Sequence, residues 1–277
     1  MNLGFIGTGS MGSILIEAFI QSEALEPKQI AASNRTKSKT QKLTDQYPDL
    51  RIYPSNIEVA LESDIIFICV KPLEFKNVID EIKNVLLPSQ IIVSITSPIL
   101  IKHLEDQLPC KIAKIIPSIT NHECSGASLC MYGNKITEED KQTLEELLKP
   151  ISEPLRISEK FTRVTSDISS CGPAFLAFFI QNFVEAAVKE TGIPREEATR
   201  LASEMVLGTG KLLTSGGFTP ETLTERVCVP GGITAEGIKL MSNELDGVFN
   251  QLIQTTHAKY EEDLNKVESM FYDSSKN

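Results

Sequence analysis

The sequence predicts an α/β protein in which a doubly wound parallel sheet at residues 1–158 precedes an all-helical domain at residues 159–277. Over the first half of the chain, short apolar runs alternate with amphipathic segments at near-regular spacing, which is typical of βαβ units with right-handed crossovers. The character of the sequence changes near Glu159, and from Pro173 onward only long helical patterns occur, with glycine and proline where those helices should end. These two patterns define both the fold class and the domain division.

The N-terminal stretch LGFIGTGSMG, residues 3–12, joins a short apolar run to a Gly-x-Gly-x-x-Gly turn and leads directly into an apolar-periodic segment. This order of strand, turn and helix is typical of a Rossmann-type dinucleotide site. Gly7 would permit the tight turn, Gly9 would let the backbone approach a pyrophosphate, and Gly12 would let helix and strand pack closely. The pyrophosphate would then lie against free N–H groups at the start of the helix.

The other expected elements follow from the same periodicities. Strands are expected at residues 29–32, 51–53, 65–70, 91–95 and 111–116, with edge strands at 129–132 and 155–157. Helices are expected at residues 56–63, 75–87, 99–107, 138–148, 174–191, 195–213, 220–226, 234–241 and 247–271. The strand at 65–70 ends at Lys71-Pro72. Because the carboxyl ends of parallel strands line the ligand crevice, Lys71 is expected beside the coenzyme.

The residues after the second strand bear on the choice of coenzyme. Where an enzyme that prefers NAD usually has Asp or Glu, this chain has Ser33-Asn34-Arg35-Thr36-Lys37. A guanidinium with flanking hydroxyls suits a 2′-phosphate, which a carboxylate would repel, so NADP(H) is favoured over NAD. A polar surface turn with incidental cations is the alternative reading of the same residues.

Composition and charge limit the kinds of partner that the protein can bind. The 277 residues carry 27 basic and 37 acidic side chains, a net charge of -10, which gives no general attraction to nucleic acid or anionic lipid. The longest apolar run, 174–180, is too short to span a membrane, and the N-terminus lacks the pattern of a signal peptide, so a cytoplasmic protein is expected. The six cysteines and three histidines share no ligand spacing, so neither a metal site nor a disulfide framework is expected.

The segment Ala174–Phe183 is apolar nearly all round. A helix of this kind must be covered on every side, which a domain of this size can hardly do alone. We therefore expect a homodimer, or a higher homo-oligomer, joined through the C-terminal helices. The alternative is a helix buried within one subunit.

Several segments together resemble the pyrroline-5-carboxylate reductase family across nearly the whole chain. They are GFIGTGSMG at 4–12, VKP at 70–72, CGPAF at 171–175, GIPREEATRLASEMVLGTGKLL at 192–213 and VPGGIT at 229–234. Within the family, TNHECSGAS at 120–128, SDISSCGPAF at 166–175 and HAKYEED at 257–263 are most similar to the ComER branch. The resemblance implies a Rossmann domain that binds NADP, a helical dimerisation domain, and hydride transfer to the C=N carbon of 1-pyrroline-5-carboxylate to give L-proline.

The resemblance also implies roles for individual residues. The coenzyme would contact Ile6, Gly7, Thr8, Gly9, Ser10 and Met11 at its pyrophosphate, Asn34, Arg35 and Thr36 at its adenosine phosphate, and Asn56, Val70, Lys71 and Pro72 along its length. Thr234 matches a threonine that hydrogen-bonds the substrate nitrogen, and Glu159 matches an acidic residue near the substrate. Gly231, Gly232, Ile233 and Thr234 would bind the substrate, with the backbone N–H groups of residues 232–235 taking its carboxylate. By composition alone, Thr234 is a helix N-cap.

The chain departs from the family pattern in two loops. Where the family usually has S-G-S-G-P and M-P-N-T-P, this chain has Ser169-Ser170-Cys171-Gly172-Pro173 and Ile116-Pro117-Ser118-Ile119-Thr120. Val229 replaces a serine, and Ile233 a Thr or Ala. Cys171 is read as a packing residue. These changes keep open a weak or inactive regulatory paralogue that retains the dinucleotide site, or a reductase of another small cyclic imine. A 3-hydroxyacid dehydrogenase is disfavoured because residues 174–180 contain no lysine.

Overall fold

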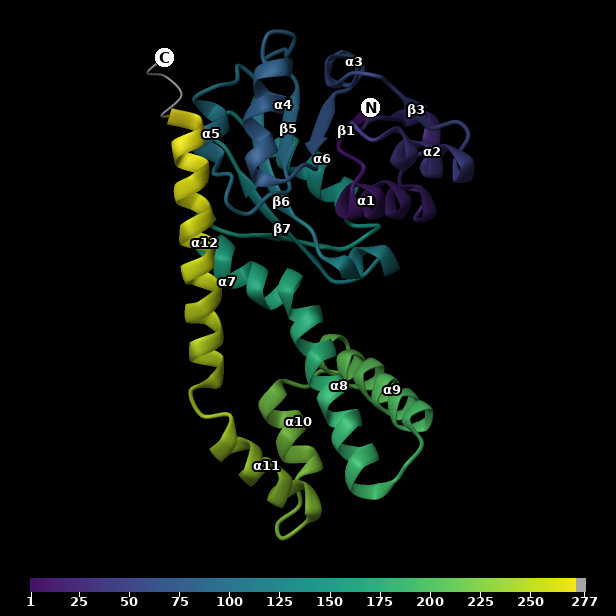
Figure 1. The fold of residues 1–277 in the computed structure, drawn as a ribbon, viewed down its shortest axis with the longest axis vertical. Coiled ribbons are helices and arrows are strands. Elements are labelled where there is room, and N and C mark those ends of the chain that lie inside the picture. The colour runs from purple at the N-terminus through teal and green to yellow at the C-terminus, as the bar shows by residue number, and fades with distance from the viewer. Residues whose placement is uncertain (273–277) are drawn as a thin grey trace. The chain divides into compact units, whose positions relative to one another are not determined.

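The computed structural model describes residues 1–272, which form two compact units (Figure 1). The first unit contains Met1–Gly172 together with the C-terminal residues from Thr256, and the second is Pro173–Thr255. The predicted division between residues 158 and 159 differs from this one. Residues 159–171 hydrogen-bond to the sheet, and the last turns of the C-terminal helix pack on it through Val267 and Phe271, so both segments belong to the first unit. The domain of 159–277 ends in residues outside the described part of the chain.

The first unit holds one eight-stranded sheet with the order β3-β2-β1-β4-β5-β6-β7-β8. The strands are β1 (Leu3–Ile6), β2 (Ile30–Ser33), β3 (Arg51–Ile52), β4 (Ile65–Ile68), β5 (Ile91–Ser94), β6 (Lys111–Ile116), β7 (Ala127–Tyr132) and β8 (Glu153–Arg156). Neighbours pair in parallel except β6 and β7, which are antiparallel. The chain winds outward in both directions from the β1–β4 pair. The predicted doubly wound sheet is thus confirmed, and its topological switch point lies between β1 and β4.

Helices cover both faces of this sheet, which explains why its central strands are apolar on both sides. One buried cluster joins the sheet to α1 (Ser10–Gln21), α2 (Lys37–Gln46) and α6 (Glu138–Leu148). A second cluster joins the other face to α3 (Asn56–Leu61), α4 (Phe75–Ile82), α5 (Ile101–Glu105) and the end of α12 (Val248–Tyr272). Helix α4 ends at Ile82, before the predicted residue 87, and Leu86 is buried from the loop that follows.

The glycine turn after β1 has the close packing that its sequence predicts. A Cβ on Gly12 would lie 2.2 Å from the carbonyl oxygen of Gly7, so helix α1 can approach the strand only with glycine there. A Cβ on Gly9 would meet no protein atom within 4 Å. The packing of the chain itself therefore does not require glycine at residue 9, and the space beside it is open to a ligand.

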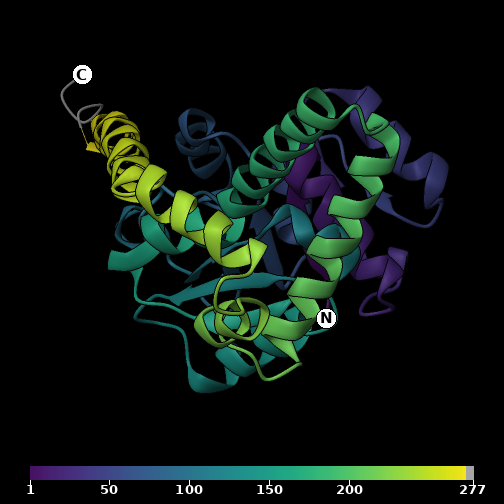
Figure 2. The same ribbon diagram turned by 90° about the horizontal axis from the view of Figure 1, so that it is seen from below.

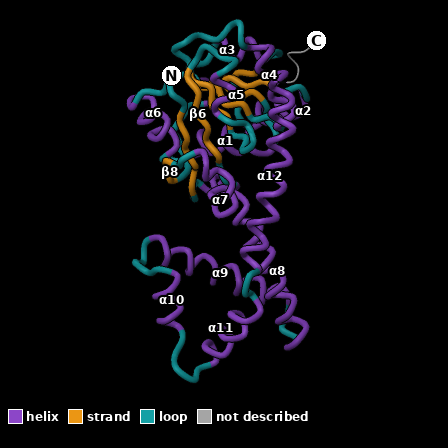
Figure 3. Tube along the Cα trace, turned by 90° about the vertical axis from the view of Figure 1, so that its left-hand side faces the viewer, coloured by secondary structure: helices purple, strands orange, loops and turns teal. Residues whose placement is uncertain are grey.

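The second unit contains helices and loops, whereas the described strands lie in the first unit (Figure 3). Its helices are α8 (Gly172–Thr191), α9 (Arg195–Thr214), α10 (Pro220–Val227), α11 (Ile233–Glu244) and the start of α12. Helices α8 and α9 are two arms joined by a short turn (Figure 2), and Val184 packs against Ala198 and Ala202. Large apolar side chains along α8 are exposed, including Phe178 at 68% and Phe183 at 59%. The alternative of a helix buried within one subunit is therefore wrong.

The helical segment Glu159–Thr191 corrects the expectation that no segment could span a membrane. It is long and apolar enough to do so by length and composition, and 6% of its most apolar stretch is buried within the chain. The expectation counted unbroken apolar residues, and the helix continues beyond that run through polar residues on both sides. The chain itself therefore leaves most of this apolar stretch uncovered.

Candidate coenzyme and substrate sites

A continuous groove follows the carboxyl ends of the strands from β2 to β6. Two adjoining hollows form it, and both are lined by Gly9, Lys39, Cys69, Val70 and Lys71. The hollow toward β2 also includes Ile6, Gly7, Asn34, Arg35, Thr36 and Asn56. The hollow toward β6 also includes Ser10, Met11, Ile95, Thr96 and Pro117. We call the two together the coenzyme groove. It brings together the residues predicted to bind the coenzyme, apart from Thr8 and Pro72, which are their chain neighbours.

The β2 end of the groove is organised by two asparagines. The backbone N–H of Thr8 donates to Oδ1 of Asn34 at 3.1 Å, and the Asn34 amide donates to the carbonyl of Thr36 at 3.0 Å. The Ser33 hydroxyl donates to Oδ1 of Asn56 at 2.7 Å. These bonds tie the glycine turn to the residues after β2. Because the adenosine lies beyond the second strand in this fold, a bound coenzyme is expected to place its adenosine here, and we call this the adenosine end of the groove.

The guanidinium of Arg35 lies beside a carboxylate in this structure. Its side chain is 86% exposed, and its Nη1 lies 3.4 Å from Oε2 of Glu74. A surface ion pair of this kind contributes little to stability, so replacing Glu74 by a phosphate as the partner of Arg35 would cost little. A coenzyme phosphate would compete with Glu74 for Nη1 of Arg35.

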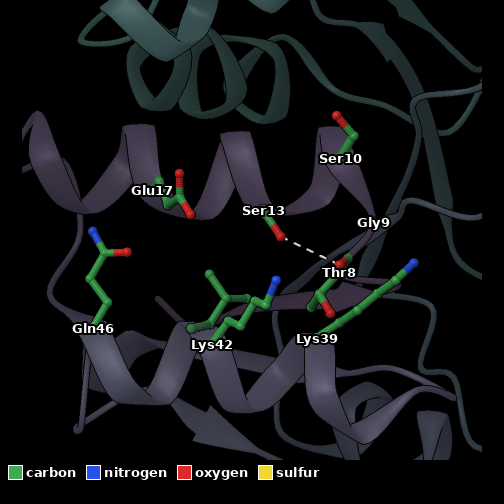
Figure 4. A pocket seen from close by; sticks show the side chains of 9 residues that line it. Thr8, Gly9, Ser10, Ser13, Glu17, Lys39, Lys42 and Gln46 are labelled. Atoms are coloured by element: carbon green, nitrogen blue, oxygen red, sulfur yellow. Dashed lines mark hydrogen bonds between the residues drawn. The ribbon is translucent and has the colours of Figure 1, made fainter.

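Lys39 is a residue that the sequence interpretation missed. It lines the coenzyme groove and also a neighbouring hollow between α1 and α2, shown in Figure 4, whose other lining residues include Thr8, Ser10 and Lys42. Among the described residues, neither lysine is in an ion pair. The Oγ1 atom of Thr8 is buried there without a hydrogen-bond partner. The sequence could have indicated Lys39, because it lies in the first turn of the helix that follows β2.

One acidic group shares the α1/α2 hollow with these cations. Glu17 lies further along α1 than Ser13, whose hydroxyl donates to the carbonyl of Thr8 at 3.4 Å (Figure 4). The mouth of the hollow beside Gly9 is therefore the part that suits an anion, with Lys39, the Thr8 hydroxyl and the start of α1 around it.

The other end of the groove lies at the ends of β4, β5 and β6. Val70, Thr96 and Pro117 line it, and the Thr96 hydroxyl donates to the carbonyl of Val70 at 3.3 Å. Cys69 also lines this end, and burial raises the pKa of its thiol. With the adenosine expected at β2 and the pyrophosphate at Gly9, the nicotinamide of a bound coenzyme is expected here, and we call this the nicotinamide end.

Glu159 lies apart from the coenzyme groove. Its Oε1 accepts hydrogen bonds from Nζ of Lys114 at 3.0 Å and from the backbone N–H of Ile101 at 2.9 Å. Lys114 is fully buried in β6, and burial lowers the pKa of its ammonium group. Glu159 lines none of the hollows described above, so the structure does not bring it together with the other predicted site residues of the first unit.

The predicted substrate loop lies in the second unit, before α11. Gly232 is the N-cap of that helix and Thr234 its second residue, so the prediction that Thr234 is the cap is wrong; Gly231, with φ of 74°, turns the chain one residue earlier. The N–H groups of Gly232 and Ala235 already donate to the carbonyls of Val229 and Gly232. Those of Ile233 and Thr234 stand at the helix start, where no intrahelical partner exists. Ile233 is 94% exposed.

Two family models match separate parts of the chain. Residues 159–263 match the family described as pyrroline-5-carboxylate reductase dimerisation, and residues 2–98 match the family described as NADP oxidoreductase coenzyme F420-dependent. Among curated proteins, ComE operon protein 4 of Bacillus subtilis is 43% identical over 98% of this chain and 100% of its own. Pyrroline-5-carboxylate reductase of Escherichia coli is 30% identical over 87% of this chain and 90% of its own.

A solved structure shares the whole architecture. The crystal structure of Plasmodium falciparum pyrroline carboxylate reductase with NADP bound covers 98% of both chains with a TM-score of 0.82 and 25% sequence identity. Fold, groove and relatives together define an NADP-binding oxidoreductase with a helical dimerisation domain. The chain belongs to the pyrroline-5-carboxylate reductase family, and its resemblance to the ComER branch is confirmed by the Bacillus subtilis relative.

Proposed function

We propose that the protein reduces 1-pyrroline-5-carboxylate to L-proline with NADPH, as a cytoplasmic homodimer. The observation that carries this proposal is the coenzyme groove, continuous from Asn34 to Pro117 and open at Gly9, in a chain whose relatives along most of its length are named pyrroline-5-carboxylate reductases. The residues present fit the coenzyme: Gly9 is open, the Thr8 hydroxyl is buried without a hydrogen-bond partner, and Lys39, which is in no ion pair among residues 1–272, lines the groove and the hollow beside it.

The reaction makes modest chemical demands on the protein. NADPH supplies the hydride when it is bound. A cyclic imine protonated on nitrogen is already an electrophile, so the chain must hold the ring, orient it and exclude water. Thr234 is proposed to hydrogen-bond the imine nitrogen, while the free N–H groups of Ile233 and Thr234 bind the carboxylate at the positive end of α11. Gly231 and Gly232 shape that loop.

Different residues of the groove are proposed to bind different parts of the coenzyme. The segment Ile6–Met11, with Gly7, Thr8, Gly9 and Ser10, takes the pyrophosphate at the start of α1. Asn34, Arg35, Thr36 and Lys39 take the adenosine phosphate. Asn56, Val70, Lys71 and Pro72 line the remaining length. Lys39 joins the adenosine-phosphate set because it lines the same hollow as Asn34, Arg35 and Thr36.

Glu159 is proposed to support the site and not to contact the substrate. Glu159 accepts both of its hydrogen bonds from the first unit, one from the buried Lys114 of β6 and one from the backbone at the start of α5. A carboxylate held in this way is occupied by its protein partners, so its removal should affect folding before it affects chemistry.

The exposed apolar side chains of α8 support the homodimer. A second copy offers the same apolar helix, and the matching family is named for dimerisation, so a partner chain is a better cover for residues 159–191 than a lipid bilayer. The net charge of -10 supports the absence of nucleic acid and anionic membrane partners.

A spectrophotometric assay tests the reaction. Purified protein with NADPH and 1-pyrroline-5-carboxylate should lose absorbance at 340 nm and accumulate proline. NADPH binding without turnover would favour the regulatory paralogue, a reading supported by the altered loop at Ser170 and Cys171 and by Val229. Turnover of another small cyclic imine, without turnover of pyrroline-5-carboxylate, would show that the protein is an imine reductase with a different substrate.

A further inference from the structure

The two loops that depart from the family pattern face each other in the structure. The Ser170 hydroxyl donates to the carbonyl of Pro117 at 2.9 Å, and the Ser118 hydroxyl donates to the carbonyl of Ser169 at 3.0 Å. Each loop therefore supplies one hydroxyl and one carbonyl to the other. We call this reciprocal pair of bonds the serine clasp.

Both sides of the serine clasp are anchored. Ser118 is 1% exposed, and its N–H donates to Oδ1 of Asn121 at 2.8 Å. On the other side, residues Asp167–Cys171 form a π-helical turn. The buried Asp167 fixes that turn by accepting from Nη2 of Arg163 and from the Thr256 hydroxyl, both at 2.8 Å. Each side of the clasp is therefore also bonded to its own surroundings.

The clasp lies directly behind the nicotinamide end of the coenzyme groove. Pro117, whose carbonyl accepts from Ser170, lines that end together with Val70 and Thr96. Glycine, the usual family residue at position 170, has no side chain with which to donate this bond. We propose that Ser170 and Ser118 are positioning residues that fix Pro117 as a wall of the nicotinamide subsite. This inference rests on the proposed coenzyme orientation and not on turnover.

Binding of whole and truncated coenzyme tests the inference. NADPH reaches the Pro117 wall, whereas 2′,5′-ADP carries only the adenosine half and does not. Ser170→Gly and Ser118→Ala are each expected to weaken NADPH binding about fivefold, the loss of one hydrogen bond, and to leave 2′,5′-ADP binding within about twofold. Titration calorimetry on the full dimeric protein gives both dissociation constants.

Ser152→Ala is the matched control. Its buried hydroxyl donates to the Ser128 hydroxyl at 2.7 Å, so the variant loses a bond of the same kind between β7 and the start of β8. It should leave the ratio of the two dissociation constants unchanged. Equal weakening of both ligands by either clasp variant, no weakening of NADPH, or a changed ratio in Ser152→Ala would each overturn the proposal. If the wild-type protein binds NADPH but reduces no imine, the proposed reaction is wrong, whereas the comparison of the two dissociation constants still tests the clasp.

Discussion

The ammonium group of Lys114, in a side chain with no exposed surface, lies 3.0 Å from Oε1 of Glu159. Glu159→Gln removes the charge that compensates this buried ammonium, so we expect the free energy of unfolding to fall by about 2 to 3 kcal/mol. The estimate is at the low end because Glu159 is 29% exposed. Urea denaturation measures it. Adding Lys114→Met should restore most of the loss, and no restoration would contradict the pairing.

His103 should make the protein less stable in mild acid. It stacks on Phe271 with ring centroids 5.2 Å apart, and burial lowers the pKa of its imidazole below the ordinary 6.5. Below pH 6.5 the unfolded chain therefore binds a proton that the folded chain resists, so stability falls as the pH decreases, whereas above 6.5 this contribution is constant.

Urea midpoints at pH 8 and pH 5.5 measure this effect. His103→Gln can retain an acceptor for the N–H of Leu100, which now donates to Nδ1 of His103. It should reduce the difference between the two midpoints, even if it lowers both. The same difference in variant and wild type would show that His103 is not the group that titrates.

Lys39 should discriminate NADPH from NADH. Lys39→Gln removes a cation beside the proposed phosphate position, so we expect about tenfold weaker NADPH binding and less than twofold change for NADH. Lys42→Gln, one turn further along α2, is the control and should have a much smaller effect. Fluorescence titration of both coenzymes checks this, and equal losses for NADPH and NADH would remove Lys39 from the phosphate site.

Arg35 should also favour NADPH over NADH. Arg35→Asp places a carboxylate where a 2′-phosphate would approach, so NADPH should weaken far more than NADH. The same titrations measure it. If both coenzymes weaken equally, Arg35 has no part in reading the phosphate, and its role is the surface pair with Glu74.

Thr234 should act on the imine and not on the coenzyme. Thr234→Ala removes the hydroxyl proposed to orient the substrate nitrogen, so kcat should fall at least tenfold while the dissociation constant of NADPH stays nearly unchanged. Thr234→Ser keeps the hydroxyl and should retain most of the activity. A parallel loss of NADPH binding in Thr234→Ala would mean that the residue has been assigned to the wrong ligand.

The apolar surface of α8 should hold two subunits together. Phe178→Asp places a charge on a side chain that is 68% exposed in the single chain, so we expect the dimer dissociation constant to rise by more than tenfold. Light scattering after size-exclusion chromatography measures the mass. Lys189→Ala near the end of the same helix is the control, and an unchanged dimer in Phe178→Asp would place the interface elsewhere.

The sequence predicted those features that depend on local pattern. The strand at Lys111–Ile116 and the helix at Glu138–Leu148 have the predicted bounds, because apolar periodicity and punctuation by proline or threonine coincide there. The glycine turn was predictable for the same reason, since its three positions have separate local requirements.

Long-range relationships were not predictable from the sequence. Nothing near Glu159 indicates that it pairs with Lys114, 45 residues earlier, because their contact depends on how the segment after β8 returns to the sheet. The diversion of Arg35 by Glu74 is likewise tertiary. The serine clasp joins two loops that the sequence shows only as separate departures from the family pattern.

The central claim is that hydride passes from NADPH to the imine carbon, and isotopic transfer tests it most directly. The protein is given 1-pyrroline-5-carboxylate and NADPH that carries deuterium at the transferable C4 position, and the proline formed is analysed by mass spectrometry. We predict proline that is one mass unit heavier, with the deuterium at C5. Unlabelled proline, or no proline from protein that binds NADPH, would contradict the claim.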